Sequence, residues 1–296
     1  MALNVKNNSI PYMFLMLVKA NYYVYNILML NIPTITKGRA QLSQVLQQAG
    51  GLVSVGDVSK TLEVARTDAA KLLSRWQSQG WLRRLRRGVY APVPFTALGQ
   101  MQVLDDPWVI VPELFGPAYI GGWTAAEHWG FTEQLFRSVC VLTTRPIRSK
   151  EEIIQGIPFA LKHVRPASMF STKPIWRGQV KVELSDPAKT IIDMLDDPAI
   201  GGGIRHVDDC LGSFLKEGKT PPRELIETAD KLCNGAVFKR LGFLLEKRSG
   251  PEELITACRE RLTTGNARLD PALPSERLAT RWRLWCPASW IEGKSQ

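Results

Sequence analysis

The sequence of 296 residues contains few of the side chains that build metal or redox centres. It holds three histidines and five cysteines, and no two cysteines form a CxxC pair. An odd number of widely spaced cysteines excludes a disulfide framework and a zinc ribbon, so we expect free, buried thiols in a reducing cytoplasm. His206 and Cys210 could share one face of a helix, but two ligands are too few for a metal site. We therefore expect no bound metal.

Signatures of enzymes are also missing. There is no GxSxG segment of the kind that positions the nucleophile of serine hydrolases. The segment 212–220 resembles a phosphate-binding loop, but five residues rather than four separate its two glycines. The triple glycine at 201–203 predicts a connection between helices, and the acidic residues near 183–186 do not have the spacing of a nuclease site. We predict a protein that binds rather than catalyses and that needs no cofactor.

Acidic residues are absent from the first 36 residues, where Lys6 and Lys19 are the only charges. The apolar run from 10 to 18 ends at Lys19 and is shorter than the roughly 18 uncharged residues that a membrane span needs. The residues after it form a poor signal-peptide cleavage site. We therefore expect a cytoplasmic protein without membrane contact. Residues 1–36 are expected to form a poorly defined extension, and translation is expected to start near Met29.

Basic residues are concentrated in one short part of the chain. The formal net charge of the chain is +10, and residues 37–100 contribute ten basic and three acidic residues to it. Residues 101–296 are almost balanced, with 26 basic and 25 acidic residues. A local excess of this size indicates a polyanionic partner, most simply nucleic acid.

Residues 37–94 have the pattern of a winged helix-turn-helix domain. A first amphipathic helix is expected over 39–49. Ser54 precedes Asp57 by three residues, which is a capping-box pattern and predicts the start of a second short helix. A third helix is expected over 66–79, because its apolar residues recur at intervals of three and four. Its apolar stripe consists of Ala69, Leu72, Leu73 and Trp76.

The other side of the third helix and the hairpin after it carry basic and small polar residues. The hairpin is expected to turn at Gly88 and is rich in arginine, whose planar group suits phosphates and narrow minor grooves. Small three-helix units with a hairpin also serve as protein-interaction modules, but the charge, helix order and hairpin together favour double-stranded DNA. The candidate DNA-binding residues are Arg66, Thr67, Lys71, Arg75, Arg83, Arg84, Arg86 and Arg87.

The pattern of residues 95–296 predicts a domain of mixed strands and helices, here called the body. The predicted fold class is therefore α+β. A boundary is expected at the prolines of 92–94. The body is expected to begin with strands and to end in a helical C-terminal part. Strands are expected at 118–121, 138–144, 157–164 and 179–184, and helices at 124–129, 188–195, 204–216, 222–232, 237–247 and 252–261.

Several segments between residues 39 and 286 have the order and composition of a known family. They are Gly80–Ala91, Tyr119–Gly130, Ser185–Asp193, Gly201–Ile204, Ala236–Glu246, Leu269–Pro271 and Arg281–Trp282. In this order the segments resemble the AbiEi-family antitoxins of type IV toxin–antitoxin systems.

The resemblance implies a function in two parts. The winged helix would repress the protein's own operon by binding inverted repeats in its promoter. The C-terminal antitoxin domain would counter a toxin of the nucleotidyltransferase class, with no need for a stable complex between the two proteins. Such operons can act in abortive infection, which is a form of phage defence. Lys239 and Arg240 lie in the segment most similar to the family and are the candidate antitoxin residues.

Two alternatives are open at this point. The chain could be a winged-helix transcriptional regulator whose body senses a ligand or forms a dimer, with no toxin partner. It could also be a nuclease or transferase that a winged helix directs to nucleic acid, although no matching set of carboxylates is present.

Overall fold

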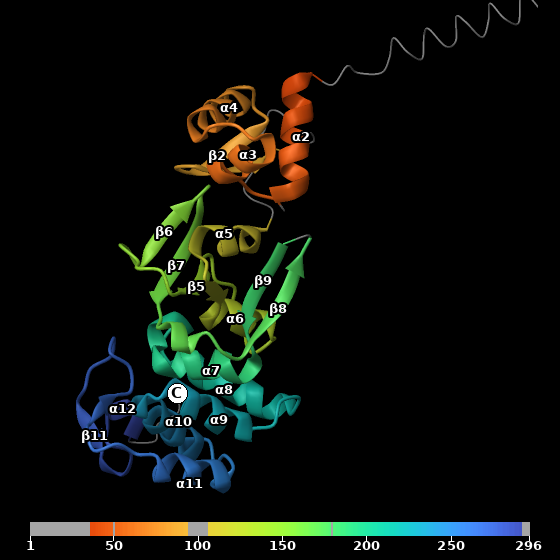
Figure 1. The fold of residues 1–296 in the computed structure, drawn as a ribbon. Helices are drawn as coiled ribbons and strands as arrows, with labels where there is room; N and C mark the ends of the chain where they lie inside the picture. The colour runs from red at the N-terminus through yellow and green to blue at the C-terminus, as the bar shows by residue number, and fades with distance from the viewer. Residues whose placement is uncertain (1–35, 50, 94–105, 179, 292–296) are drawn as a thin grey trace, which may run out of the picture.

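The computed structural model describes residues 36–49, 51–93, 106–178 and 180–291 (Figure 1). The fold is α+β, with N-terminal helices and a small sheet, a mixed central sheet and a helical C-terminal region. The predicted extension falls outside the described residues except for Thr36, and so does the predicted boundary at 94–95. Within the described ranges, no helix has the length and hydropathy that crossing a membrane requires.

The N-terminal unit is the predicted winged helix-turn-helix. Its small antiparallel sheet has the strand order β1-β3-β2. The predicted capping box is confirmed, because the Ser54 amide donates to Asp57 Oδ2 at 2.8 Å and the Asp57 amide donates to Ser54 Oγ at 3.2 Å. The elements are α2 (Lys37–Ala49), β1 (Val53–Ser54), α3 (Val55–Leu62), α4 (Arg66–Ser78), β2 (Leu82–Arg86) and β3 (Val89–Pro92).

The middle of the chain forms a six-stranded mixed sheet with the order β6-β7-β5-β4-β9-β8. Strand β5 pairs in parallel with β7, and β4 pairs in parallel with β9. All five residues of β5 are buried, as expected of a central strand. The elements are η2 (Pro107–Ile110), α5 (Val111–Phe115), β4 (Ala118–Ile120), α6 (Gly122–His128), β5 (Val139–Thr143), β6 (Glu151–Ile154), β7 (Ile157–His163), η3 (Pro166–Ser168), β8 (Thr172–Arg177) and β9 (Val180–Ser185).

The two edge strands, β6 and β8, were not predicted from the sequence. Three of the four residues of β6 are exposed, so the strand has no apolar alternation. Strand β8 contains Pro174, a residue that a sheet accepts at an edge because it cannot donate to a neighbouring strand.

The C-terminal region packs helices around α7, whose residues 188–195 are all buried. Asp186 caps α7, because its side chain accepts from the Lys189 amide at 2.7 Å, and Pro187 occupies the first turn. The predicted helices of this region are confirmed, and a small sheet of order β10-β12-β11 follows them. The elements are α7 (Pro187–Asp196), η4 (Pro198–Gly201), α8 (Ile204–Glu217), α9 (Arg223–Leu232), α10 (Gly235–Lys247), α11 (Glu252–Glu260), β10 (Ala267–Arg268), β11 (Arg277–Ala279), η5 (Thr280–Trp282), β12 (Leu284–Cys286) and α12 (Ala288–Ile291).

Candidate nucleic-acid interface

Helix α4 has one buried face and one exposed basic face. Ala69, Leu73 and Trp76 are fully buried in the core of the winged helix, whereas Leu72 is only half-buried. Because these residues fix the rotation of the helix about its axis, the opposite face is turned to solvent. All four candidate residues of α4 are exposed: Arg66, Thr67, Lys71 and Arg75.

The exposed face of α4 carries one acidic residue. Asp68 pairs with Lys71 at 3.1 Å, and both side chains are more than half exposed. A surface pair of this kind contributes at most about 1 kcal/mol, so a phosphate or a base edge can replace the carboxylate. Ala65, at the start of α4, has no side chain that could cap the helix. The Asp68 amide donates to the Ala65 carbonyl at 3.0 Å, so the amides of the first turn that an anion can reach are those of Arg66 and Thr67.

The wing consists of β2 and β3, which pair antiparallel with an irregularity between Arg84 and Arg86. Gly88 lies in the turn with φ of +82°, a conformation that glycine adopts without strain. The four wing arginines divide into two pairs. Arg84 and Arg87 are exposed, whereas Arg83 and Arg86 are half-buried.

The half-buried arginines lie on the side of the wing that meets the central sheet. Gln155, in the turn between β6 and β7, donates from Nε2 to the Arg84 carbonyl at 3.0 Å. The same side chain accepts from Arg83 Nη1 at 3.4 Å. Leu85 and Val89 of the wing also pack into the apolar cluster of the central sheet. The wing is therefore fixed to the body, with β6 pointing toward β2 (Figure 1).

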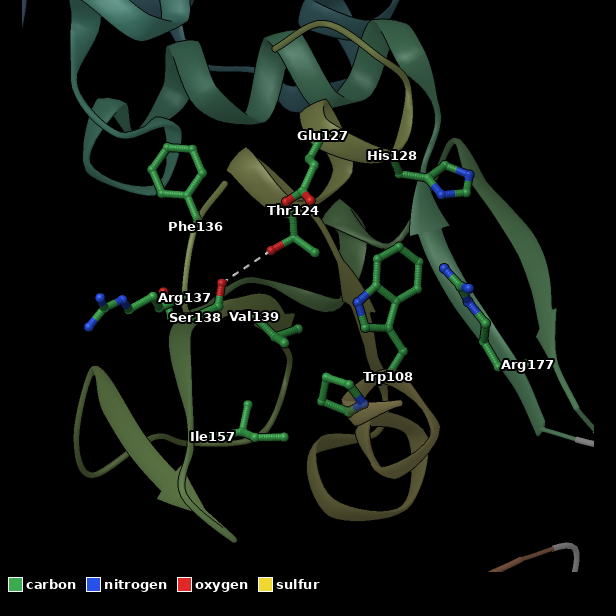
Figure 2. Close-up of a pocket in the computed structure, with 11 residues that line it drawn as sticks. Trp108, Thr124, Glu127, His128, Phe136, Arg137, Ser138, Val139, Ile157 and Arg177 are labelled. Carbon is green, nitrogen blue, oxygen red and sulfur yellow. Dashed lines mark hydrogen bonds between the residues drawn. The ribbon is translucent and has the colours of Figure 1, made fainter. Parts of the chain in front are cut away.

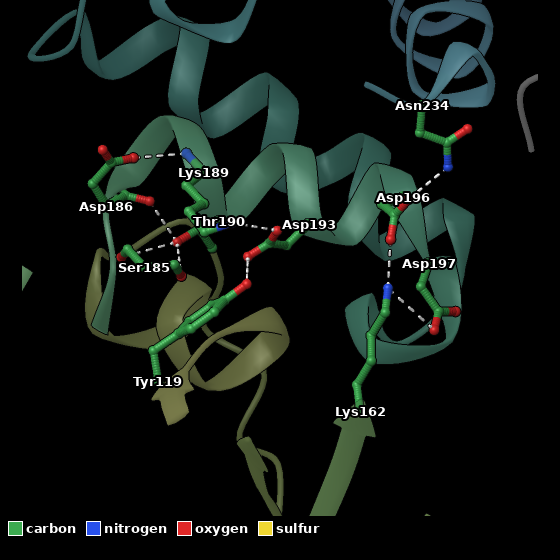
Figure 3. A network of polar contacts seen from close by, with 10 residues as sticks. All are labelled: Tyr119, Lys162, Ser185, Asp186, Lys189, Thr190, Asp193, Asp196, Asp197 and Asn234. Atoms are coloured by element: carbon green, nitrogen blue, oxygen red, sulfur yellow. Dashed lines mark hydrogen bonds and ion pairs between the residues drawn. The ribbon is translucent and has the colours of Figure 1, made fainter. Parts of the chain in front are cut away.

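A buried ion pair within α7 is joined to the central sheet by Tyr119 (Figure 3). Lys189 Nζ lies 2.9 Å from Asp193 Oδ1, and neither side chain is exposed by more than 4%. Tyr119 of β4 donates its hydroxyl to the other carboxylate oxygen of Asp193 at 2.9 Å. Burial raises the pKa of Tyr119 well above its ordinary value, and the neighbouring Asp193 raises it further, so the hydroxyl stays a donor. The segment 185–193 thus has a structural role.

A second polar cluster lies at the C-terminal end of α7 (Figure 3). Lys162 of β7 pairs with Asp196 at 2.6 Å and with Asp197 at 3.5 Å. Asn234 donates to the other oxygen of Asp196 at 2.7 Å. Burial by itself would raise the pKa of Asp196, but the charge and hydrogen bond of Lys162 outweigh it, and the pKa is lowered.

Lys239 and Arg240 are both buried in helix α10, at 2% and 5% exposure. Arg240 Nη1 donates to the Leu195 carbonyl at 2.7 Å, and its Nε donates to the Leu269 carbonyl at 3.0 Å. Lys239 Nζ donates to the Gly265 carbonyl. These contacts join α10 to the end of α7 and to the segment around β10, so the two side chains stabilise the C-terminal region.

One cavity of the central region has a volume of about 380 Å³ (Figure 2). The Arg177 guanidinium lies 4.3 Å from the centre of the Trp108 ring, and Arg177 Nε lies 3.6 Å from an Asp106 carboxylate oxygen. His128 lies beside the same indole, with 5.6 Å between ring centres. Burial, and then the charge of Arg177, lower the pKa of His128. The cavity therefore has an aromatic wall next to a cation.

The described residues contain no group of three or more His, Cys, Asp or Glu side chains that could hold a metal ion. Both ring nitrogens of His206 already have partners, the Gly201 carbonyl at 2.6 Å and the Thr132 hydroxyl at 2.8 Å. All five cysteines are free thiols, and four of them are buried, as predicted. The prediction of a buried thiol is wrong for Cys233, which is exposed at the C-terminal end of α9.

The exposed basic residues of α4 and the wing were predicted from the sequence, but the contact of Gln155 with the wing was not. A side chain that contacts a partner more than 70 positions away leaves no local pattern in the sequence. The sequence also did not predict which arginines of the wing are exposed and which are half-buried, because this depends on the same contact.

Comparison with known proteins identifies the N-terminal region. Residues 40–93 match the family described as "Transcriptional regulator, AbiEi antitoxin". The whole fold is similar to the crystal structure of the RV2827C protein from Mycobacterium tuberculosis, with a TM-score of 0.54 and 15% sequence identity. That match covers 83% of this chain and 91% of the other. No curated protein matches the sequence. The similarity to the AbiEi antitoxin family of transcriptional regulators thus lies in the N-terminal region, over residues 40–93.

Proposed function

We propose that this protein is a DNA-binding antitoxin of a type IV toxin–antitoxin system that represses its own operon and counters a nucleotidyltransferase-type toxin. The observation that carries the proposal is the exposed basic face of α4 next to an arginine-rich wing, within the region that matches the family. In this proposal residues 37–94 bind DNA, and residues 95–296 form the antitoxin domain, which needs no cofactor and performs no catalysis.

In the proposed mechanism the exposed face of α4 lies in the major groove of the promoter. Thr67 and Lys71 are on this face and would hydrogen-bond to base edges. Arg66 and Arg75, at the two ends of the helix, would contact the backbone. The exposed wing residues Arg84 and Arg87 would bind phosphates, which adds affinity without sequence preference.

The test separates repression from antitoxin activity in cells. A reporter behind the protein's own promoter measures repression, and growth during co-expression of the adjacent toxin gene measures rescue. We expect the wild type to repress and to rescue growth. Because Arg84→Ala with Arg87→Ala changes only the proposed DNA-binding part, this variant should lose repression and keep rescue. Failure of the wild type to rescue growth would contradict the antitoxin function.

A second candidate function is transcriptional regulation in response to a small ligand, without a toxin. The cavity of about 380 Å³ beside Trp108 and Arg177 favours it, because ligand pockets of proteins start at about this size. Repression without rescue of growth would support this second function. A ligand that relieves repression in the wild type but not in Trp108→Ala would then place its site in the cavity.

A further inference from the structure

The segment that joins β5 to β6 places further basic side chains beside the wing. Residues 144–150 contain three basic residues and no acid, and Arg145, Arg148 and Lys150 are all exposed. Arg145 and Arg148 line a groove of about 490 Å³, and Arg86 of the wing lines the same groove. The groove therefore brings cations of the central region next to cations of the winged helix.

The segment is held in place by contacts at both of its ends. The Arg145 amide donates to Thr143 Oγ1 at 3.0 Å, and Arg145 Nη1 donates to the Leu114 carbonyl at 3.1 Å. The Leu161 amide donates to the Lys150 carbonyl at 2.7 Å, and Ile147 packs against the core of the central sheet. Because its backbone is already ordered, the segment would lose little conformational entropy on binding.

Two acidic side chains also line the groove. Glu151 and Glu152 line the same groove and are exposed. Among the residues that the structure describes, no ion pair joins Arg86, Arg148 or Lys150 to a carboxylate. Exposed acids of this kind reduce the local positive potential without occupying the cations.

We propose that residues 144–150 form a second contact with the DNA backbone, so that the central region binds phosphates beyond those held by the wing. The proposal rests on the proposed DNA-binding function. Arg86 belongs both to the wing and to the groove, so a duplex bound to the wing continues over the groove. The contact between Gln155 and the wing fixes the distance between the two basic groups, as phosphates at fixed spacing require.

The experiment compares two double variants of the full chain that lose the same charge. Arg148→Ala with Lys150→Ala changes the proposed contact. Arg205→Ala with Lys216→Ala is the control, since both residues are exposed on α8, far from the wing (Figure 1). Binding of a 40-base-pair duplex from upstream of the gene is measured by fluorescence anisotropy at several salt concentrations. Circular dichroism and melting temperature confirm that both variants fold.

Two lost phosphate contacts should flatten the slope of log affinity against log salt by about 1.8, at about 0.9 per contact. Over a fourfold change in salt, the wild type should therefore lose about tenfold more affinity than the variant. The control should keep the wild-type slope, and Glu151→Gln with Glu152→Gln should bind more tightly. If Arg148→Ala with Lys150→Ala keeps the wild-type salt slope while Arg84→Ala with Arg87→Ala flattens it, the proposed second contact is wrong. The proposed role of the wing would then still hold. No DNA binding by the wild type would overturn the proposed function itself.

Phosphate ethylation interference on the same duplex gives an independent readout. Ethylation of the phosphates next to those bound by the wing should weaken DNA binding by the wild type. It should not weaken DNA binding by Arg148→Ala with Lys150→Ala. Identical interference patterns for the two proteins would overturn the proposal.

Discussion

Lys189 is a fully buried cation of α7, and replacing it with methionine tests the structural role of this helix. The change keeps the length of the side chain and removes its charge. It leaves the Asp193 carboxylate buried, with the Tyr119 hydroxyl as its remaining side-chain partner. Removing one partner of a buried pair typically costs about 3–5 kcal/mol. At about 2–4 °C per kcal/mol, we expect the melting temperature to fall by about 6–20 °C.

The second variant isolates the cost of the unpaired charge. Lys189→Met with Asp193→Asn buries no charge, and the amide oxygen can still accept from Tyr119. We therefore expect the double variant to be more stable than Lys189→Met alone, because replacing both members of a buried pair is often nearly neutral. Lys216→Met, on the exposed side of α8, is the control and should leave the melting temperature unchanged.

The pH dependence of the Lys189→Met variant follows from the same carboxyl group. Burial raises the pKa of Asp193 above its ordinary value, and Lys189 and Tyr119 counteract only part of that increase. Loss of Lys189 should raise the pKa further. A carboxyl with a raised pKa binds its proton more tightly in the folded state than in the unfolded state. The difference in unfolding free energy between the wild type and Lys189→Met should therefore shrink as the pH falls through that pKa. A loss of unfolding free energy below about 1 kcal/mol at pH 7 would contradict a buried, paired charge at Asp193. So would a difference in stability between Lys189→Met and the wild type that grows on acidification.

Three other variants test the polar contacts of the surface and of α7. Arg84→Ala with Arg87→Ala should weaken binding to every DNA sequence and flatten the salt slope by about 1.8, and an unchanged slope would remove the wing from the interface. Thr67→Ala should cost about 1–3 kcal/mol on the preferred sequence alone, and an equal loss on all sequences would assign Thr67 to the backbone. Asp196→Asn should lower the melting temperature at pH 7. Because the folded pKa of Asp196 is lowered, its stabilisation is present above its ordinary pKa and is lost as the pH falls through the lowered value, so the two melting curves should converge in acid.

Features that depend on neighbouring residues could be predicted from the sequence. The Ser54–Asp57 capping box and the stripe of α4 that ends at Trp76 both depend on spacings of three or four residues. Helix α7 was predicted at 188–195 and spans Pro187–Asp196. Strand β6 was not predicted, because its exposed edge position removes the alternation that marks a strand.

The arrangement of the interface could be predicted only in part. The basic residues of α4 and the wing were found from charge and helix order. The contact of Gln155 with the wing and the groove shared by Arg86 and Arg148 were not, because both depend on how the central sheet packs against the wing. The burial of Lys239 and Arg240 likewise depends on carbonyl groups of distant segments.

The most direct test of the account is the affinity of the purified full chain for DNA from upstream of its own gene, beside a shuffled duplex of the same composition. Fluorescence anisotropy at two salt concentrations gives both the specificity and the salt dependence. We predict tight binding to the native sequence with a steep salt slope, and binding to the shuffled duplex that is at least about 10³-fold weaker. Equal, weak binding to both duplexes would contradict the claim that this protein is a sequence-specific repressor.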